Sequence, residues 1–167
     1  MFKRTLAVAL GLGLLLTGCG APGRVIIQPT KPIKSYGKLG VQVLSDSFLR
    51  SIQGNKNYDN YVAICKEGEQ VIGGHITNWA NTNFKGAAGG PQLWVRMELQ
   101  EFNTGSGAAK LFLGSAANGR MVYKATLMTR EETIAQYLFE TQVTLAGNTH
   151  AFWNIAKQVE ARIAKTE

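Results

Sequence analysis

Three segments of the chain alternate apolar and polar side chains in the way that a half-buried β-strand requires. The pattern is clearest over residues 93–100 and returns over residues 121–128 and 135–145. Since successive side chains of a strand point to opposite faces, these segments predict a sheet with one covered and one solvated face. A helix opening at Thr129–Glu132 is the alternative for the third segment, but the alternation continues too far to favour it.

Other elements are predicted before the clearest strand. Leu39–Val43 predicts a first strand, and Ser45 or Asp46 can cap a short helix that carries Phe48. Two further apolar runs predict strands that flank a hairpin turn at Lys66–Glu69. These runs are Tyr61–Cys65 and Gln70–Trp79.

The last predicted element is a helix with one apolar stripe, which Asn148 or Thr149 can cap. The stripe has three- and four-residue spacing and consists of Phe152, Ile155, Ala156, Val159 and Ile163. It packs most simply on the sheet, with a partner helix or a membrane surface as the alternative. The sequence therefore predicts an α+β fold, with a small mixed sheet of four to six strands and a C-terminal helix packed on one face.

The first residues of the chain have the order of a bacterial export signal. Lys3 and Arg4 precede the apolar run Leu6–Leu16, which is too short for an ordinary membrane-spanning helix. The end of this run resembles the lipobox of bacterial lipoproteins, with Leu16, Thr17, Gly18 and Cys19 in order. An uncleaved membrane anchor, or a buried helix with a chance cysteine, is the alternative.

The lipobox resemblance implies cleavage before Cys19, with covalent diacylglycerol and an N-acyl group on that residue. Several acyl chains hold a protein firmly, because each buried methylene contributes about 0.8 kcal/mol. Gly20 stands where lipoproteins retained at the inner membrane carry aspartate. The resemblance therefore implies a protein anchored by lipid in the outer membrane, on its periplasmic face.

We expect three regions along the chain: a signal peptide over residues 1–18, a lipidated tether over 19–36 and a single periplasmic domain over 37–167. The tether range holds three prolines and no acidic residue, which favours an extended segment. Its basic residues either meet anionic headgroups or belong to a solvated linker. The net charge of +7 does not indicate a nucleic-acid partner, because an exported, membrane-bound chain does not meet one.

Cys65 is the one cysteine left once Cys19 is acylated, so no internal disulfide is expected. Its position in an apolar run favours a buried, inert thiol over a reactive or interchain one.

The sequence offers few groups for catalysis. His75 and His150 lie far apart without further ligands at metal spacing, and the zinc, redox, serine-hydrolase and phosphate-loop motifs are absent. Glu98 and Glu101 are expected on opposite faces of one strand, which argues against a pair of catalytic carboxylates. We expect a protein that is not an enzyme, with no catalytic residue, no metal and no cofactor beyond the acyl groups on Cys19.

A glycine-rich segment, Gly105–Gly119, has an apolar centre of Leu111, Phe112 and Leu113. Exposed, these side chains would form an uncovered apolar patch. The segment therefore folds back on its own domain, contacts a subunit or another protein, or inserts into a membrane, and we take the three residues as candidate partner contacts.

Ile72–Trp79, Gly105–Gly114 and Gly119–Ala125 together resemble the domain-of-unknown-function 4410 lipoproteins. The shared pattern is a Gly-x-Ile segment, a Gly-Ser-x-Ala run ending in Leu-x-Gly, and Gly-Arg opening a strand. That family resembles the periplasmic α/β domains of curli-channel, TolB-like and penicillin-binding-protein-activator lipoproteins. The resemblance implies helices packed on a small mixed sheet and binding to other envelope proteins, often in rings, and it carries no catalytic residues.

These observations predict an envelope protein that binds or assembles with other envelope components, including copies of itself, as an accessory to a secretion or surface-polymer system. The first alternative is a lipoprotein that binds a small ligand or lipid through Trp79, Trp94 and Trp153. The second is a surface-exclusion or inhibitor lipoprotein.

Overall fold

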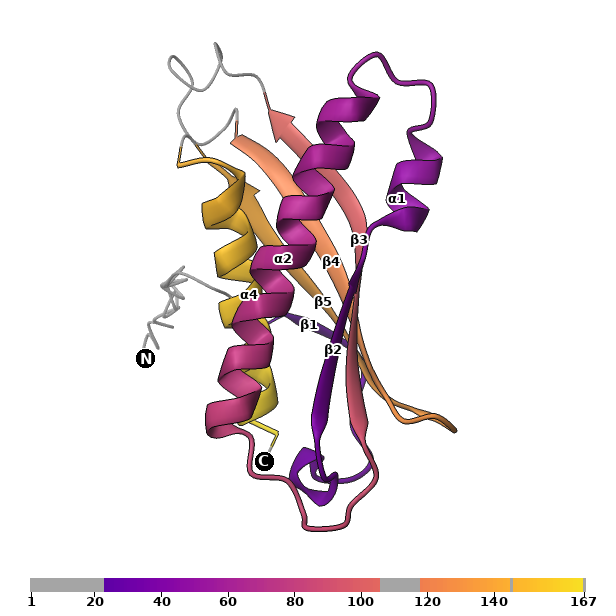
Figure 1. Ribbon diagram of the computed structural model, residues 1–167, viewed down its shortest axis with the longest axis vertical. Helices are drawn as coiled ribbons and strands as arrows, with labels where there is room; N and C mark the ends of the chain where they lie inside the picture. Colours follow the sequence, from indigo (N-terminus) through magenta and orange to yellow (C-terminus); the bar gives the residue numbers. More distant parts are fainter. Residues whose placement is uncertain (1–22, 106–117, 145, 167) are drawn as a thin grey trace, which may run out of the picture.

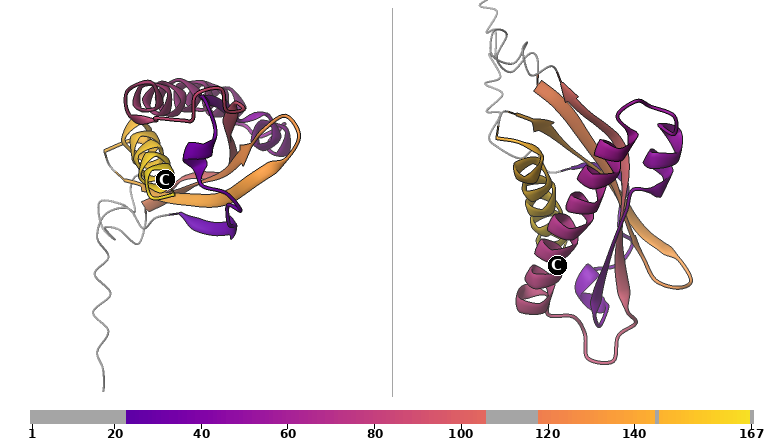
Figure 2. Two further views of the ribbon diagram at one scale, coloured as in Figure 1. Left: turned by 90° about the horizontal axis from the view of Figure 1, so that it is seen from below. Right: turned by 45° about the horizontal axis from the view of Figure 1, so that its top comes forward.

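The computed structural model describes residues 23–105, 118–144 and 146–166, which form a sheet covered on one face by helices (Figure 1). Seen from the end of the molecule, α2 (Tyr58–Asn83) and α4 (Asn148–Ala164) lie on the same side of the sheet (Figure 2). The predicted α+β class, the mixed sheet and the C-terminal helix packed on it are confirmed.

The sheet has five strands in the order β1-β5-β4-β3-β2. Their bounds are β1 (Arg24–Ile27), β2 (Leu39–Leu44), β3 (Leu93–Gly105), β4 (Asn118–Met128) and β5 (Thr133–Val143). β2 runs parallel to β3, and every other neighbouring pair is antiparallel. The first predicted strand and the three alternating segments are therefore confirmed.

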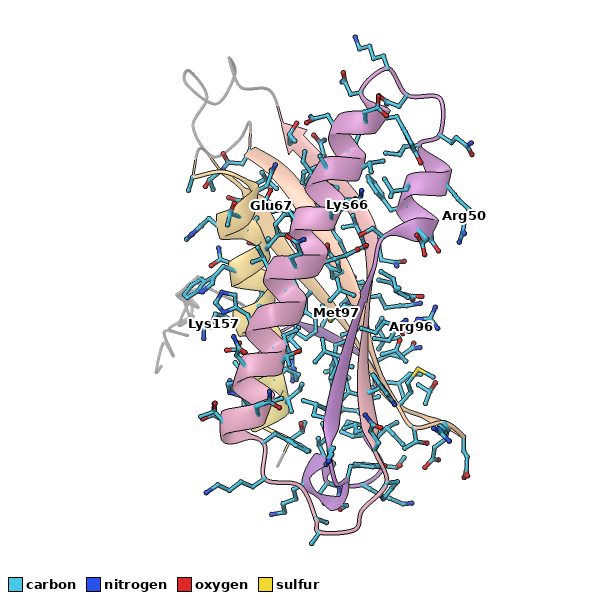
Figure 3. All side chains as sticks on the ribbon, in the orientation of Figure 1. Arg50, Lys66, Glu67, Arg96, Met97 and Lys157 are labelled. Atoms are coloured by element: carbon cyan, nitrogen blue, oxygen red, sulfur yellow. The ribbon has the colours of Figure 1, made fainter. Side chains whose placement is uncertain are left out.

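The alternation along β3 separates the two faces of the sheet. Met97 is fully buried, whereas 43% of the Arg96 side chain is exposed. Figure 3 shows Met97 between the sheet and the helices and Arg96 reaching away from them. The helix-covered face thus holds the core, and the opposite face is polar.

Residues 58–83 form one continuous helix, α2, so the two strands and the hairpin turn predicted there are wrong. The buried residues of α2 have helical spacing: Cys65, Gly68, Ile72, Ile76 and Ala80. A long crossover is required here because β2 and β3 are parallel neighbours, which no tight turn can join. The β-branched residues and the Gly73–Gly74 pair imitate strand and turn locally, but packing against β2 and α4 decides the outcome.

The predicted stripe of the C-terminal helix is buried along its whole length. Its five residues are each 1% exposed or less: Phe152, Ile155, Ala156, Val159 and Ile163. The predicted cap is wrong, because the N-cap is Gly147, with a positive φ of 91°. The hydroxyl of Thr149 instead donates to the carboxylate of Glu67 on α2.

The short helix α1 (Asp46–Ser51) is confirmed, with Ser45 as its N-cap residue. An aromatic cluster joins it to the rest of the domain. The rings of Phe48, Tyr61 and Phe102 meet edge to face, with centroids 5.9 to 6.5 Å apart. α1 is therefore fixed to both α2 and β3.

The described part of the predicted tether is packed on the domain, so an extended linker is wrong from Gly23 onward. β1 pairs with β5, and Ile33 in the 3-10 helix η1 (Ile33–Ser35) is fully buried. The guanidinium of Arg162 on α4 also donates to the carbonyl of Gly23 at 2.5 Å. The prolines of this range interrupt regular structure but do not prevent its apolar residues from docking on a sheet edge and the core.

Candidate functional site

Several predicted site residues lie outside the described part of the chain. They are the lipobox residues Leu16, Thr17 and Gly18, the acylation residue Cys19, and the candidate contacts Leu111, Phe112 and Leu113. Among the helices that the structure describes, none combines the length and apolar character needed to cross a bilayer.

The three tryptophans do not share one binding site. Trp94 lines a cavity at the end of the sheet near η1, and Trp153 lines a separate groove between α2 and α4. Trp79 packs, partly buried, against the core. A single lipid pocket formed by all three residues is therefore not present in the described region.

The first of these spaces, which we call the η1 pocket, has a volume of about 510 Å³ and lies between η1, the start of β3 and the β4–β5 turn. Its volume is in the range of small-molecule sites. The indole of Trp94 rests against Gly40 of β2, where a Cβ atom would come within 2.5 Å of the ring. Trp94 nevertheless stays 37% exposed, so part of the aromatic surface faces the pocket.

One wall of the η1 pocket is held by the loop between α2 and β3. The amide of Ala87 donates to the carbonyls of Lys34 and Tyr36, and that of Gly37 donates to the carbonyl of Pro91. A side chain at Gly86 would collide with the backbone of Tyr36 and Gly37. The loop therefore needs glycine to approach this closely, and the hydrogen bonds keep the wall in place.

The facing wall is the turn between β4 and β5, residues 129–132. The hydroxyl of Thr129 accepts hydrogen bonds from the amides of Glu131 and Glu132, both at 3.2 Å. The amide of Thr129 in turn donates to the carbonyl of Glu132 at 2.9 Å. This turn is formed by local hydrogen bonds, so it does not open a helix as the alternative interpretation supposed.

Tyr36 lies between the two walls and is only 4% exposed. Its phenolic oxygen has no hydrogen-bond partner among the described residues. Burial and the nearby carboxylate of Glu132 raise the pKa of Tyr36, so the hydroxyl keeps its proton. A buried hydroxyl of this kind needs a partner from solvent or from a bound molecule.

The η1 pocket also gathers charges of both signs. Lys31 and Arg130 contribute cations, and Glu131 and Glu132 contribute carboxylates. The ion pairs found in the described region include none of these four side chains. The pocket therefore presents donors and acceptors that remain available.

The groove between α2 and α4, which we call the helix groove, has a volume of about 310 Å³. The rings of His75 and His150 lie 6.2 and 6.3 Å from the ring of Trp153, and the Lys157 ammonium lies 5.5 Å from it. Both histidines are on helices, so the expected strand position of His75 is wrong. In the described region no three His, Cys, Asp or Glu side chains group as metal ligands.

Cys65 is 2% exposed, as predicted, although it belongs to α2 rather than to a strand. Burial is the largest cause of the raised pKa of its thiol. The thiol is therefore protonated near neutral pH and shielded from reagents.

The uncovered face of the sheet carries a network of ion pairs. Arg120 binds Glu140 with donor–acceptor distances of 2.7 and 2.9 Å, and it reaches Glu101 at 2.8 Å. Glu98 pairs with Lys124 and with Arg96 at 3.0 Å each. Every acidic group of this network is thus matched by a cation, as on a solvated structural surface.

A β-bulge between Leu99 and Glu101 changes the predicted placement of two carboxylates. The extra residue reverses the alternation, so Glu98 and Glu101 share the uncovered face and Phe102 turns into the core. Opposite faces were expected for the two carboxylates, and that expectation is wrong. They bind different cations, Lys124 and Arg120, instead of forming a pair.

The two edges of the sheet are of different kinds. β1 at one edge exposes Ile26 (48%) and Ile27 (42%), which are among the most exposed large apolar residues described. β2 at the other edge pairs only with β3 within the described sheet. Both edges therefore offer backbone groups for pairing with another strand.

Sequence reasoning missed the residues that form the η1 pocket. Lys31 and Tyr36 fall in the range expected to be a tether, and Arg130 falls in a turn that has no apolar pattern. Their meeting depends on η1 docking beside the β4–β5 turn, a long-range contact with no local signal. Trp94 is the one residue of this pocket for which the sequence predicts contact with a ligand.

Comparison with known proteins supports the fold but assigns no family. No family model matches the chain, and no curated protein does. The PelC dodecamer from Paraburkholderia phytofirmans in space group P6 is 7% identical, with a TM-score of 0.50 over 84% of this chain and 96% of that one. A point variant of the same dodecamer in space group C2 is also 7% identical, with a TM-score of 0.48 over 84% and 94%. At this identity the likeness is one of fold.

Proposed function

We propose that the protein is a lipid-anchored envelope protein without enzymatic activity, which assembles with copies of itself through the edges of its sheet. The observation that carries this proposal is the pair of unlike edges: β1 exposes Ile26 and Ile27, and β2 pairs only with β3 among the described strands. Pairing β1 of one copy with β2 of the next would bury the isoleucines and continue the sheet.

Contacts between two different surfaces are heterologous, and they close into rings when the rotation between copies permits. The PelC structure with a TM-score of 0.50 has a similar fold and is a dodecamer, and this supports assembly as a use of the fold. The network around Arg120 and Glu98 supports a structural role for the uncovered face, because each of its described carboxylates is bound by a cation. Anchoring rests on the lipobox resemblance at Cys19.

The full chain in mild detergent provides the test of assembly. Analytical ultracentrifugation should give a multiple of the monomer mass for the parent protein and a monomer for the double variant Ile26→Lys with Ile27→Lys. Gln100→Lys, an exposed position on β3, is the control and should keep the parent mass. A monomeric parent, or a double variant that still assembles, would contradict the proposal.

The anchor is tested separately by growing cells with labelled palmitate. The parent chain should incorporate the label, and the Cys19→Ala variant should not. Equal labelling of both would show that the acyl groups are elsewhere, and the lipobox assignment would then be wrong.

A second candidate function is the binding of a small ligand, and the η1 pocket favours it. The pocket combines a volume of about 510 Å³, the partly exposed ring of Trp94 and the hydroxyl of Tyr36, which has no partner among the described residues. Apolar surface with a few fixed polar groups is typical of ligand sites. This function is compatible with assembly, because the pocket lies within one copy of the chain.

A further inference from the structure

We infer that the η1 pocket binds a small zwitterion of amino-acid or dipeptide size, which carries an ammonium and a carboxylate on a partly apolar frame. The inference rests on the second candidate function and names its ligand class. It does not depend on assembly or on the acyl anchor.

The η1 pocket is already formed before a ligand arrives. The loop before β3 is fixed by the amides of Ala87 and Gly37, and the β4–β5 turn is fixed by the hydroxyl of Thr129. A preformed site loses little conformational freedom on binding, which favours affinity for small molecules.

The side chain of Tyr36 gives the η1 pocket a buried polar group. Tyr36 is 96% buried, lines the pocket and has no described partner for its hydroxyl. Since burial holds its proton in place, this hydroxyl can donate to a ligand oxygen as well as accept a hydrogen bond. A polar end on the ligand would supply the partner that the described residues do not give this hydroxyl.

The charged side chains of the η1 pocket indicate the charge of the ligand. Two cations, Lys31 and Arg130, and two carboxylates, Glu131 and Glu132, line the same pocket without an ion pair in the described region. The charges balance, so neither a simple anion nor a simple cation is favoured. A molecule with one charge of each sign satisfies both sets, and charge-assisted hydrogen bonds are the stronger ones. The exposed part of Trp94 accommodates the apolar frame between the charges.

The test uses isothermal titration calorimetry with the full chain in detergent and three probes. These are phenylalanyl-glycine with free ends, the same dipeptide acetylated and amidated, and glucose as an uncharged polyhydroxyl compound. The free dipeptide should bind, and blocking its charged ends should weaken binding at least about tenfold. Glucose should give no heat of binding.

Variants then locate the site. Tyr36→Phe should weaken dipeptide binding without lowering the melting temperature, since its hydroxyl has no protein partner in the described region. Arg130→Gln and Glu132→Gln should each weaken it as well. Arg50→Gln, on α1 and outside the pocket (Figure 3), should bind as the parent does.

Three outcomes would overturn the inference, and they distinguish it from the more general proposal that the pocket binds a small ligand. Equal binding of the free and blocked dipeptides, or binding of glucose alone, would leave a ligand site but exclude a zwitterion. Binding that Tyr36→Phe, Arg130→Gln and Glu132→Gln leave unchanged would place the ligand elsewhere. No heat with any probe would exclude the zwitterion alone, because three probes do not represent every small ligand, and the mass of the assembly is measured independently.

Discussion

The α-carbon of Gly68 on α2 faces the ring of Phe152 on α4 so closely that a Cβ atom would lie 2.6 Å from the ring. The two helices meet at this point over the core, and Phe152 is only 1% exposed. Since the ring is enclosed by other side chains, it cannot move aside at low cost.

Gly68→Ala should therefore destabilise the protein, even though alanine is the better helix former. We expect a loss of about 1 to 3 kcal/mol in the free energy of unfolding, which is typical of an overpacked core. Urea titration followed by circular dichroism measures it. An alanine at this position that leaves the midpoint unchanged would show that the helices are further apart than described.

Gly74→Ala is the matched substitution at a glycine further along the same helix. No described residue lies within 4 Å of a Cβ atom at this position, so the methyl group has room in the described structure. The variant should gain about 0.5 to 1 kcal/mol, because alanine restricts the unfolded chain more than glycine does. The same urea titration should place its midpoint above that of the parent, and a lower midpoint would contradict the continuous helix.

The contribution of Glu140 to stability should depend on pH. Hydrogen bonds from Arg120 are the main reason that the pKa of Glu140 lies below its ordinary value of 4.5. A lowered pKa in the folded state means that the ionised group stabilises the fold above pH 4.5, and that this stabilisation disappears as the pH falls through the folded value.

Glu140→Gln should thus be less stable than the parent at neutral pH, and the difference should vanish in acid. Denaturant unfolding between neutral pH and pH values below 4.5 measures the effect, which will be small because both side chains are half exposed. Glu131→Gln is the control, since Glu131 has no ion pair within the described region. Parallel pH curves for parent and Glu140→Gln would count against the link to Arg120.

Arg162 should control the docking of β1. Its guanidinium lies 5.2 Å from the centre of the Tyr137 ring and donates to the carbonyl of Gly23. Arg162→Ala should raise amide exchange over Arg24–Ile27 by roughly tenfold, and Arg162→Lys should restore little because an ammonium lacks the planar stack. Hydrogen exchange with mass spectrometry measures Arg24–Ile27 and β4, and the exchange rate of β4 should not change because β4 is the internal reference.

Cys65 should be unreactive in the folded protein. The Cys19→Ala chain has Cys65 as its one thiol, which is 2% exposed and has a pKa raised by burial. Maleimide labelling should be at least about a hundredfold slower in native buffer than in denaturant. Rapid labelling of the folded chain would place the thiol at the surface and would contradict the position of α2 on the sheet.

The sequence predicted the elements whose pattern is set by one neighbouring layer. Residues 93–100 alternate because one face of β3 meets the helices, and the spacing of Phe152 and Ile155 follows from one buried stripe. Both patterns survive without knowledge of the topology. The same holds for the burial of Cys65, which follows from its apolar neighbours whether they form strand or helix.

The failures involve contacts between distant parts of the chain. Residues 58–83 contain β-branched side chains and paired glycines that indicate strands locally, and the parallel pairing of β2 with β3 makes them a helix. The bulge at Leu99 shifts Glu101 to the face of Glu98, and alternation counted along the sequence cannot include such an insertion. The η1 pocket is lined by residues from 31–36 and from 129–132, which are far apart in the sequence. No local pattern can therefore predict it.

The contact between Arg162 and Gly23 fixes the chain to the domain close to Cys19, and this limits how far the domain can lie from a membrane that anchors Cys19. If Cys19 carries the fatty chains, the four residue steps from Cys19 to Gly23 span at most about 14 Å. So short a connection limits the distance between the domain and the membrane, and it limits the range of orientations that the domain can adopt. Neighbouring copies would then lie at the same distance from the membrane and in similar orientations. This lowers the entropic cost of pairing their edge strands.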